Sequence, residues 1–497
     1  MGWKATMARL AAGLVAPRIY REHEHAVALQ QQVLQQLINK AQHTRFGTEH
    51  EFTGIKNYHD FRHAVPVKEY EDMRHYIEMI AEGKPGTLWP GMPLYFCKSS
   101  GTTSGIKYIP LTRESIAEQI RAARNALLMY VYETGRAEFF DHKMIFLQGS
   151  PELGHHGEVP CGRLSGIVYH HVPAYLNRNR MPSYTTNCID DWEQKVDAIA
   201  RETLREKMSL ISGIPPWVVM YFERLLEVSG KKTVREVFPQ FQLFVYGGVN
   251  YEPYRAKLET LMGQRIPSVE TYPASEGFIA FQDSQVQPGL LLNVNAGIFY
   301  EFIKVEDIGK PGAHRMMLEE VELGVNYAIL LSTNAGLWAY NLGDTVKFVS
   351  LQPYRIVVTG RVKHFISAFG EHVIAEEVEY AMQQAAHALG AQVAEFTVAP
   401  QVNPEAGLPY HEWLIEFAVP PGDREGFQLK LDTCMQEKNI YYRDLRAGNI
   451  LKSLQVVSLR KGSFVDYMKE TGKLGGQNKV ARLTNNRAIA QELLRLQ

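Results

Sequence analysis

The chain has 497 residues, more than one hydrophobic core usually serves, so we expect two or three domains. Its 53 lysines and arginines balance 54 aspartates and glutamates, and this even charge argues against nucleic acid or an anionic membrane as partner. No apolar run reaches the roughly 20 residues that cross a bilayer. Four widely spaced cysteines fit a reducing cytoplasm better than a disulfide framework or a zinc site.

Residues 1–85 are expected to be mainly helical, beginning with an amphipathic helix. From residue 94 onward, strand and helix patterns alternate. We expect strands at 94–98, 107–112, 143–149, 209–213, 241–248 and 265–272, and helices at 113–133, 189–208, 215–230 and 251–263. Thr112 is placed to cap the first of these helices. Strands separated by helices predict an α/β fold with a largely parallel sheet.

The pattern changes twice toward the C-terminus. After Gln282, β runs at 290–305 and 327–349 predict an antiparallel sheet or a distorted barrel beside the parallel sheet. A polar, glycine-containing turn near Gly360 marks a domain boundary. We therefore expect a large domain over 1–360 and a small α+β domain over 361–497, with a loop-like tail after Ser463.

The stretch KSSGTTSGIK, at 98–107, lies between two predicted strands. Backbone N–H groups in a glycine-rich turn form an anion-binding nest, and hydroxyl groups add donors. A polar surface turn is the alternative. A P-loop is excluded because the spacing G-x-x-x-x-G-K-[ST] is absent. The candidate phosphate-binding residues are Ser99, Ser100, Gly101, Thr102, Thr103, Ser104 and Gly105.

Other polar groups follow predicted strands. TYPASEGF supplies Tyr272, Ser275 and Glu276, and this glutamate is either a Mg²⁺ ligand or a surface carboxylate. In YNLGDTVKF, Asp344 is either a partner of a ribose diol or a turn residue. FVYGGVN ends a strand at the edge where α/β proteins bind ligands. Lys479 in the tail is a mobile positive charge, with Lys473 as its rival.

These stretches, in this order, resemble the adenylate-forming superfamily of acyl-CoA synthetases, peptide-synthetase adenylation domains and luciferases. Within it, the chain is most similar to the Gretchen Hagen acyl acid–amido synthetases, and we expect a bacterial member. The resemblance rests on SSGTTSG, TYPASEG, YNLGD, GRVKHFISAFGEHV, GIPPW and a late Q-x-K-x-x-R stretch. Two departures are Asn341, where plant members commonly have arginine, and Pro273, where superfamily relatives often have glycine.

The resemblance implies roles for the matching residues. The hydroxyl-rich loop would line the triphosphate of ATP. The adenine would be bordered by Gly247, Gly248, Val249 and Tyr272. Ser275 would reach the α-phosphate, Glu276 would hold Mg²⁺, and Asp344 would bind the ribose. Arg361 would touch the nucleotide beyond a hinge, and Lys479 would neutralise charge during adenylation.

The implied activity is adenylation of a small carboxylic acid, followed by acyl transfer to an amino acid with release of AMP and diphosphate. An AMP-forming acyl-CoA ligase and a non-catalytic nucleotide-binding protein with the same fold are the alternatives. Tyr169, Tyr175 and Trp217 hint at an aryl or other apolar acid. The identities of acid and amine and the oligomeric state stay open.

Overall fold

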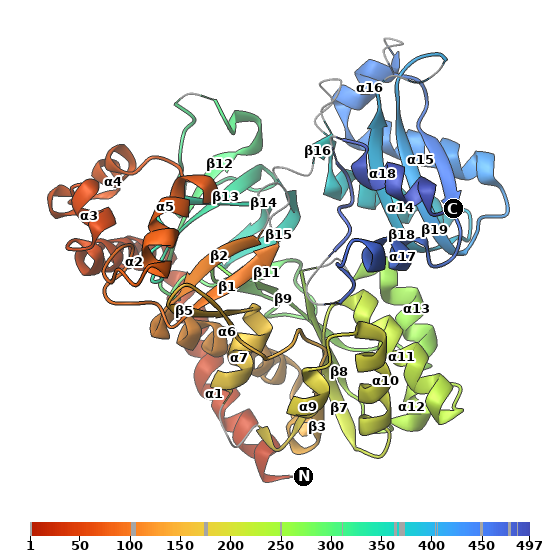
Figure 1. Cartoon of the computed structure of the whole chain (residues 1–497), viewed down its shortest axis with the longest axis horizontal. Helices are drawn as coiled ribbons and strands as arrows, with labels where there is room; N and C mark the ends of the chain where they lie inside the picture. The colour runs from red at the N-terminus through yellow and green to blue at the C-terminus, as the bar shows by residue number, and fades with distance from the viewer. Residues whose placement is uncertain are drawn as a thin grey trace. The chain divides into compact units, whose positions relative to one another are not determined.

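The computed structural model describes residues 2–100, 106–172, 177–248, 251–310, 312–361, 365–366, 373–402, 404, 406–447, 451–475, 479–484 and 486–497 (Figure 1). Contacts group the chain into two compact units. The first comprises Met1–Asn250, Lys257–Leu342 and Val346–Val357, and the second comprises Tyr251–Ala256, Gly343–Thr345 and Val358–Gln497. Within the described ranges, no helix combines the length and apolar character that a membrane crossing needs.

The first unit begins with five α-helices: α1 Trp3–Glu24, α2 Ala26–Ala41, α3 Arg45–Glu49, α4 Tyr58–Ala64 and α5 Tyr70–Ala81, with the short 3-10 turn η1 at Phe52–Gly54. The N-termini of α3 and α4 are capped by polar side chains. Thr44 accepts a hydrogen bond from the Gly47 N–H, and Asn57 accepts one from the Asp60 N–H. A buried cluster that includes Trp338 joins α2, α3, α4 and α5 to the rest of the unit, whereas α1 packs in a separate cluster with α6, Arg113–Thr134.

A mixed sheet of 11 strands forms the centre of the fold, in the order β12-β13-β14-β15-β11-β10-β9-β8-β7-β3-β6. Its parallel part contains β3 Lys143–Phe146, β6 Arg180–Met181, β7 Met208–Ser212, β8 Leu243–Gly247 and β9 Ser268–Pro273. The predicted parallel α/β arrangement is therefore confirmed. These strands are short, and their hydrophobic runs place most of their side chains in the interior.

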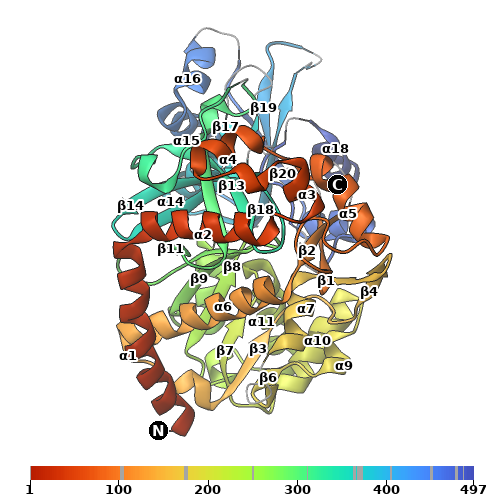
Figure 2. The same cartoon turned by 90° about the vertical axis from the view of Figure 1, so that its left-hand side faces the viewer.

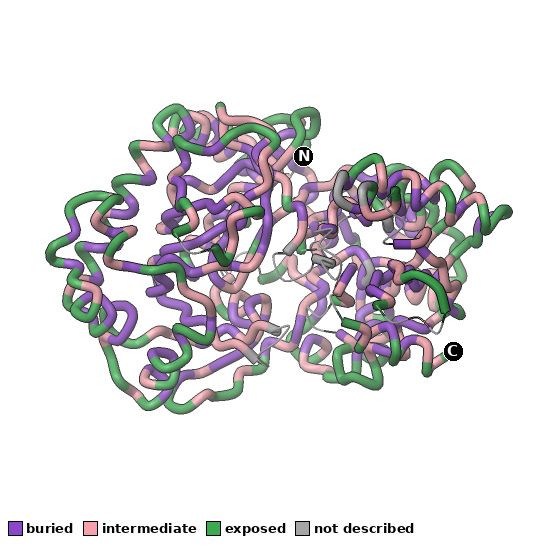
Figure 3. The backbone as a smooth tube through the Cα atoms, turned by 90° about the horizontal axis from the view of Figure 1, so that it is seen from above, coloured by how far each residue is buried: buried purple, intermediate pink, exposed green. Residues whose placement is uncertain are grey.

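The antiparallel strands continue the same sheet, because β9 turns directly into β10 and the two strands pair antiparallel. The remaining strands are β10 Phe278–Phe281, β11 Leu290–Leu292, β12 Ile298–Lys304, β13 Asn326–Thr333, β14 Tyr340–Leu351 and β15 Tyr354–Arg361, with 3-10 turns η3 Val305–Asp307 and η4 Leu318–Glu320. β10, β12 and β13 are buried almost throughout. Figure 3 shows buried, intermediate and exposed residues along the backbone.

Helices connect the strands of the first unit: α6 Arg113–Thr134, α7 Leu164–His171, α9 Tyr184–Asn187, α10 Trp192–Thr203, α11 Pro215–Ser229, α12 Val234–Val237 and α13 Glu252–Met262, with η2 at Glu138–Asp141. Thr112 caps α6 as predicted, since its hydroxyl oxygen accepts from the Ser115 N–H at 3.1 Å. α11 begins at Pro215, also as predicted, where a missing N–H costs nothing.

A separate sheet of four strands, ordered β2-β1-β5-β4, carries the hydroxyl-rich stretch. Its strands are β1 Tyr95–Ser100, β2 Ile106–Leu111, β4 Gly154–His156 and β5 Val159–Gly162. β1 and β2 pair antiparallel, while β1 and β5 pair parallel. The two strands expected on either side of the stretch are thus present.

The second unit contains the sheet β18-β19-β20 and the two-stranded ladder β16-β17. Its elements are β16 Phe365–Ile366, β17 Val373–Ile374, α14 Ala375–Ala388, β18 Gln392–Gln401, β19 Tyr410–Val419, α15 Arg424–Lys438, α16 Ile440–Ala447, β20 Gln455–Leu459, α17 Ser463–Glu470 and α18 Ala488–Arg495. The prediction of a loop-like tail after Ser463 is wrong for its first part, because α17 buries Phe464 and Tyr467 three residues apart.

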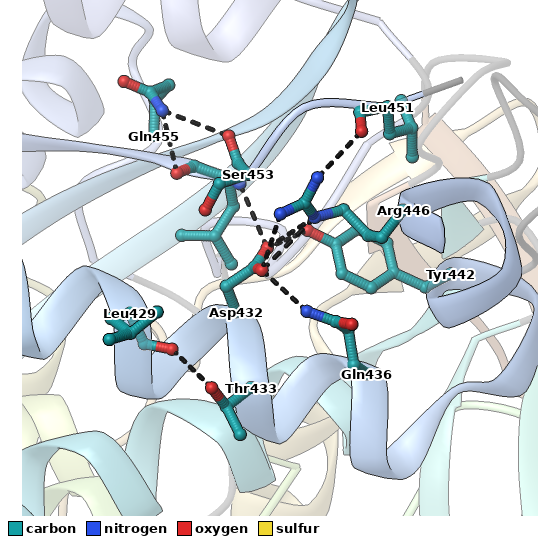
Figure 4. Close-up of polar contacts among 10 residues, drawn as sticks. Leu429, Asp432, Thr433, Gln436, Tyr442, Arg446, Leu451, Ser453 and Gln455 are labelled. Atoms are coloured by element: carbon teal, nitrogen blue, oxygen red, sulfur yellow. Dashed lines mark hydrogen bonds and ion pairs between the residues drawn. The ribbon is translucent and has the colours of Figure 1, made fainter. Parts of the chain in front are cut away.

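A buried carboxylate ties α15, α16 and the residue before β20 together (Figure 4). Asp432 on α15 is 2% exposed and accepts hydrogen bonds from the Tyr442 hydroxyl at 2.7 Å, from Arg446 at 3.2 Å and from the Leu454 N–H at 3.2 Å. Burial, followed by the charge of Asp432, raises the pKa of Tyr442 well above its usual value, so the phenol stays a donor.

Candidate functional site

The β1–β2 hairpin presents the hydroxyl-rich stretch. Its register pairs Cys97 with Ile109, Ser99 with Lys107 and Ser100 with Ile106, so the hairpin closes between Ser100 and Ile106. Gly101, Thr102, Thr103, Ser104 and Gly105 lie outside the described residues. Their predicted phosphate contacts therefore stay predictions, whereas the strands that lead into and out of the stretch are defined.

Cys97 fastens β1 to the turn that carries the candidate acidic residue. Its thiol donates a hydrogen bond to the Ser275 hydroxyl, with 3.1 Å between sulfur and oxygen. Burial raises the pKa of the Cys97 thiol to about 12, with a further rise from the charge of Glu276, so the group stays protonated and remains a donor. The hairpin and the Ser275–Glu276 turn, which are far apart in sequence, are in direct contact.

The turn between β9 and β10 has a fixed backbone. The N–H of Ala274 donates to the carbonyl of Gly277 at 2.9 Å, and the reverse bond measures 3.2 Å. From α6, the side-chain amide of Gln119 donates to the Ala274 carbonyl at 2.9 Å. Glu276 is 9% exposed at this turn. A strand-end turn held from two sides keeps the Ser275 hydroxyl and the Glu276 carboxylate close together.

The oxygen groups of this turn suit Mg²⁺. That ion binds hard oxygen ligands and typically uses one or two carboxylates together with substrate phosphates and water. Among the described residues, no group of three or more His, Cys, Asp or Glu side chains forms a metal cage. Glu276 supplies one carboxylate at this turn, and one or two carboxylates are what Mg²⁺ on a nucleotide typically uses.

The glycine pair at the end of β8 lies close to the backbone of β9. Gly247 lies opposite Thr271, and a Cβ at Gly247 would lie 2.3 Å from the Thr271 carbonyl oxygen, so no side chain fits there. Gly248 has a φ of 72°, in the left-handed region that favours glycine. Val249 lies outside the described residues. Glycine at position 247 is therefore required by the close approach of β8 to β9.

Tyr272 follows Thr271 on β9 and is 6% exposed. Its ring belongs to the apolar cluster of Ile279, Leu292 and Ile298. The Thr271 hydroxyl donates to the Tyr246 carbonyl at 2.9 Å, which fixes the end of β8 against β9. The first unit thus gathers the glycine pair, Tyr272 and the Ser275–Glu276 turn along the ends of two neighbouring strands.

Asp344, Arg361 and Lys479 are grouped with the second unit. Asp344 is buried on β14, and the hydroxyl of its neighbour Thr345 accepts a hydrogen bond from Thr359 on β15 at 2.8 Å. Arg361 ends β15, and its side chain lies outside the described part of the chain. Their predicted contacts with the nucleotide stay predictions.

Lys479 is exposed, but the chain that follows it is anchored. The Thr397 hydroxyl on β18 donates to the Ala481 carbonyl at 2.7 Å, and the Val398 N–H donates to the Arg482 carbonyl at 2.8 Å. The Arg482 guanidinium contacts carboxylates on β18 and α14 and lies 4.6 Å from the centre of a phenylalanine ring on β18. The candidate lysine therefore projects from a short segment next to a fixed point.

Sequence reasoning missed the roles of Cys97 and Gln119. Cys97 is a buried strand residue, and its contact with Ser275 depends on how two sheets meet. Strand alternation offers a signal, because Cys97 lies two residues before Ser99 and shares its face of β1. Gln119 lies in the second turn of α6, and no sequence signal marks it. Among Tyr169, Tyr175 and Trp217, the aromatic residues expected to favour an apolar acid, Trp217 packs against Trp192 with ring centroids 4.5 Å apart.

Models of a known family match most of the chain. They are described as the GH3 family N-terminal domain, matching residues 16–187 and 156–267, the GH3 family central domain, matching 291–361, and the GH3 family C-terminal domain, matching 376–488. Together the matches begin in α1 and end at the start of α18.

Curated relatives include two groups of plant enzymes. The jasmonoyl–L-amino acid synthetase JAR4 of Nicotiana attenuata is 22% identical over 387 residues, a match that spans 64% of this chain and 66% of that protein. The indole-3-acetic acid-amido synthetase GH3.8 of Oryza sativa subsp. indica is 24% identical, and the match covers 92% of this chain and 88% of that protein.

Solved structures share the fold. The AtGH3.15 acyl acid amido synthetase in complex with 2,4-DB superposes with a TM-score of 0.81 at 16% identity, covering 97% of this chain and 96% of that chain. A 2-hydroxyisobutyryl-CoA ligase in the postadenylation state gives a TM-score of 0.60 at 14% identity, covering 95% and 92%. At these identities the likeness shows the mixed α/β fold alone, with distinct N- and C-terminal parts.

Proposed function

The chain belongs to the GH3 family, and we propose from this membership that it is an ATP-dependent, AMP-forming ligase that joins a small carboxylic acid to an amino acid. The observation that carries the proposal within the structure is the contact between Cys97 and Ser275. It puts a hydroxyl-rich hairpin beside a carboxylate-bearing turn, which is the pairing that an ATP-using site requires.

The proposed reaction has two steps. An oxygen of the carboxylate attacks the α-phosphorus of ATP, and diphosphate leaves. The amine nitrogen then attacks the acyl carbon of the mixed anhydride, AMP leaves with the bonding electrons, and the nitrogen loses a proton. The first step turns a carboxylate oxygen, which is a poor leaving group, into part of AMP, which is a good one. Because both reactants are anions, the first step needs positive charge and hydrogen-bond donors around the phosphates.

The chain offers these groups as follows. The hairpin from Ser99 to Gly105 supplies hydroxyl and backbone donors to the phosphates, and the Ser275 hydroxyl reaches the α-phosphate. Mg²⁺ held by Glu276 would supply further positive charge there. Asp344 accepts hydrogen bonds from the ribose hydroxyls, with Arg361 also at the nucleotide, and Lys479 places its ammonium near the reacting oxygens. Rate enhancement then comes mainly from positioning and electrostatics.

An amino acid is the acceptor that we favour. The curated relatives above are named for amino acid or amido synthesis, whereas the CoA ligase is similar in fold alone. We further propose that residues 361–497 act as a small mobile domain that brings Lys479 to the site for the first step, since the two half-reactions need different surroundings. Four free cysteines fit a cytoplasmic location.

The test begins with exchange of labelled diphosphate into ATP in the presence of single acids from an aryl and aliphatic panel. Exchange that depends on the acid identifies adenylation, and its absence with every acid would favour a non-catalytic nucleotide-binding protein. Acids that support exchange are then incubated with ATP and either the amino acids or CoA. Formation of an amide supports the proposal, whereas formation of a thioester alone identifies an acyl-CoA ligase.

Two variants test the site itself. Glu276→Ala and Lys479→Ala are expected to slow exchange at least 100-fold, because each removes a group that interacts with the transition-state charge. Lys473→Ala is the matched control for the lysine, since it is also exposed and belongs to the same tail. If the Lys473 variant loses exchange while the Lys479 variant keeps it, the assignment of the mobile lysine is wrong.

A further inference from the structure

The carboxyl end of β3 lies beside two cations, Arg163 directly before α7 and Lys195 in α10. Within the described ranges, no aspartate or glutamate forms an ion pair with either side chain. β3, α7 and α10 all belong to the first unit and lie in the same part of it (Figure 1 and Figure 2). The carboxyl ends of strands are where α/β proteins usually bind their ligands.

The chain on either side fixes the position of Arg163. Gly162, the residue before it, pairs with Cys97 in the ladder between β1 and β5. The side chain then lies over Gly149, since a Cβ at Gly149 would be 2.8 Å from the Arg163 Cδ. The guanidinium is half-buried, and burial lowers its pKa, yet an arginine side chain stays charged. Because no counter-ion is present among the described residues, an anion from outside the chain would stabilise this charge.

Lys195 adds a second positive charge at the same strand end. The residue is 2% exposed, and its ammonium donates to the carbonyls of Gln148 at 3.0 Å and Asn187 at 2.6 Å. Both acceptors are neutral, and burial lowers the pKa of the ammonium to about 8. Gln148 directly precedes Gly149, so the two cations border consecutive residues of the chain.

Two amide side chains at this strand end add further donors. The Gln148 Nε2 and both polar side-chain atoms of Asn187, which is 0% exposed, form no hydrogen bond within the described part of the chain. Buried polar groups in proteins are nearly always paired, so such a group generally marks a bound molecule or water. A carboxylate has only acceptors, and two cations with two amide groups supply the donors that it needs.

The sheet order separates this strand end from the proposed nucleotide position. β7 lies between β3 and β8, and neighbouring strands are about 4.8 Å apart, so β3 is about 10 Å from the glycine pair at the end of β8. Cys97 is close to both places, because its thiol bonds to Ser275 and its strand partner Gly162 precedes Arg163. An acid whose reacting carboxylate lies at Ser275 is therefore able to extend toward Arg163.

We propose that Arg163 binds a second anionic group of the acid substrate, so that the chain prefers dicarboxylic acids. This inference rests on the function proposed above and narrows its substrate class. The guanidinium donates two parallel hydrogen bonds to the second carboxylate, and Lys195 contributes positive potential nearby. The activated carboxylate loses its charge on adenylation, whereas the second carboxylate stays charged through both steps. A permanent cation therefore suits the group that does not react.

Calorimetric titration of the whole chain with pairs of acids tests the proposal, with and without a non-hydrolysable ATP analogue. The pairs are hexanoate and adipate, octanoate and suberate, and benzoate and terephthalate. The wild type is expected to bind the dicarboxylic member of at least one pair about tenfold more tightly, and Arg163→Gln should lose this preference. Arg205→Gln, at an exposed arginine just after α10, is the matched control and should bind like the wild type. The melting temperature of Arg163→Gln should not fall, because no ion pair is lost.

Three results would overturn the proposal: no preference for the dicarboxylic member of any pair, a preference that Arg163→Gln leaves unchanged, and a loss in Arg163→Gln that is equal for both members. A raised KM for ATP in diphosphate exchange would then assign the arginine to the phosphates. A raised KM for the amino acid, with dicarboxylate binding unchanged, would assign it to the acceptor. Binding is measured without turnover, so an Arg163-dependent preference together with no exchange for any acid would refute the ligase function and leave the anion site standing.

Discussion

Replacing Asp432 by alanine should strongly destabilise the second unit. The carboxylate is 2% exposed and accepts hydrogen bonds from a tyrosine, a glutamine, an arginine and a backbone N–H (Figure 4). The substitution leaves the Arg446 guanidinium, which is 21% exposed, without its counter-charge. Removing one partner of a buried ion pair costs about 3–5 kcal/mol, most of it from the charge left behind.

Urea denaturation followed by tryptophan fluorescence measures this loss, because Trp413 is fully buried in the core of the second unit. The matched control is Asp466→Ala, which removes a 2.6 Å ion pair with Arg460 whose side chains are 37% and 48% exposed. Such an exposed pair contributes at most about 1 kcal/mol. Equal losses in the two variants, or a loss below about 1 kcal/mol for the Asp432 variant, would refute the reasoning from burial.

Three further predictions concern the first unit. Gly247→Ala should lose about 1–3 kcal/mol of stability and most adenylation, because its Cβ would lie 2.3 Å from a backbone carbonyl oxygen. The Cβ of Gly54→Ala meets no atom within 4 Å, so this control variant should change little. Equal melting temperatures of the two variants would contradict this reasoning. The Cys97 thiol has a pKa of about 12, so about one part in 10,000 is thiolate at pH 8. Iodoacetamide should therefore label the partly exposed Cys188 before Cys97, as detected by mass spectrometry. Preferential labelling of Cys97 would contradict its burial. Burial lowers the pKa of His23 from 6.5 to about 4, so the unfolded state binds a proton before the folded state does. The free energy of unfolding should therefore fall as the pH falls from 6.5 toward 4. The melting temperature of His23→Gln should fall less over this pH range, and an identical fall would exclude His23 as a cause.

The sequence predicted the parts of the site that depend on local order. Hydroxyls and glycines between two short strands predicted the hairpin, and polar residues after strands predicted the β9–β10 turn and the glycine pair. The contact between Cys97 and Ser275 was beyond reach, because it joins residues 178 positions apart in two different sheets. Such a contact depends on how the sheets pack, which no local pattern encodes.

Two helices illustrate the same limit. α17 was predicted as loop because the tail is rich in lysine and glycine, and eight residues are too few for a clear helical period. α1 was correctly predicted as a helix, but its pattern could not show which face packs inward. The alanine face lies in the core because α6 passes close to it, and this follows only from tertiary structure.

The anchorage of the chain at Ala481 and Arg482 makes the preceding residues a short tether. Val480, which lies between this anchor and Lys479, also packs against the apolar cluster of Phe464, Tyr467 and Leu493. Packing on this side therefore limits where the backbone of Lys479 can lie. One residue inserted between Lys479 and Ala481 would shift the attachment point of the lysine side chain by about 3.5 Å, more than the length of a hydrogen bond.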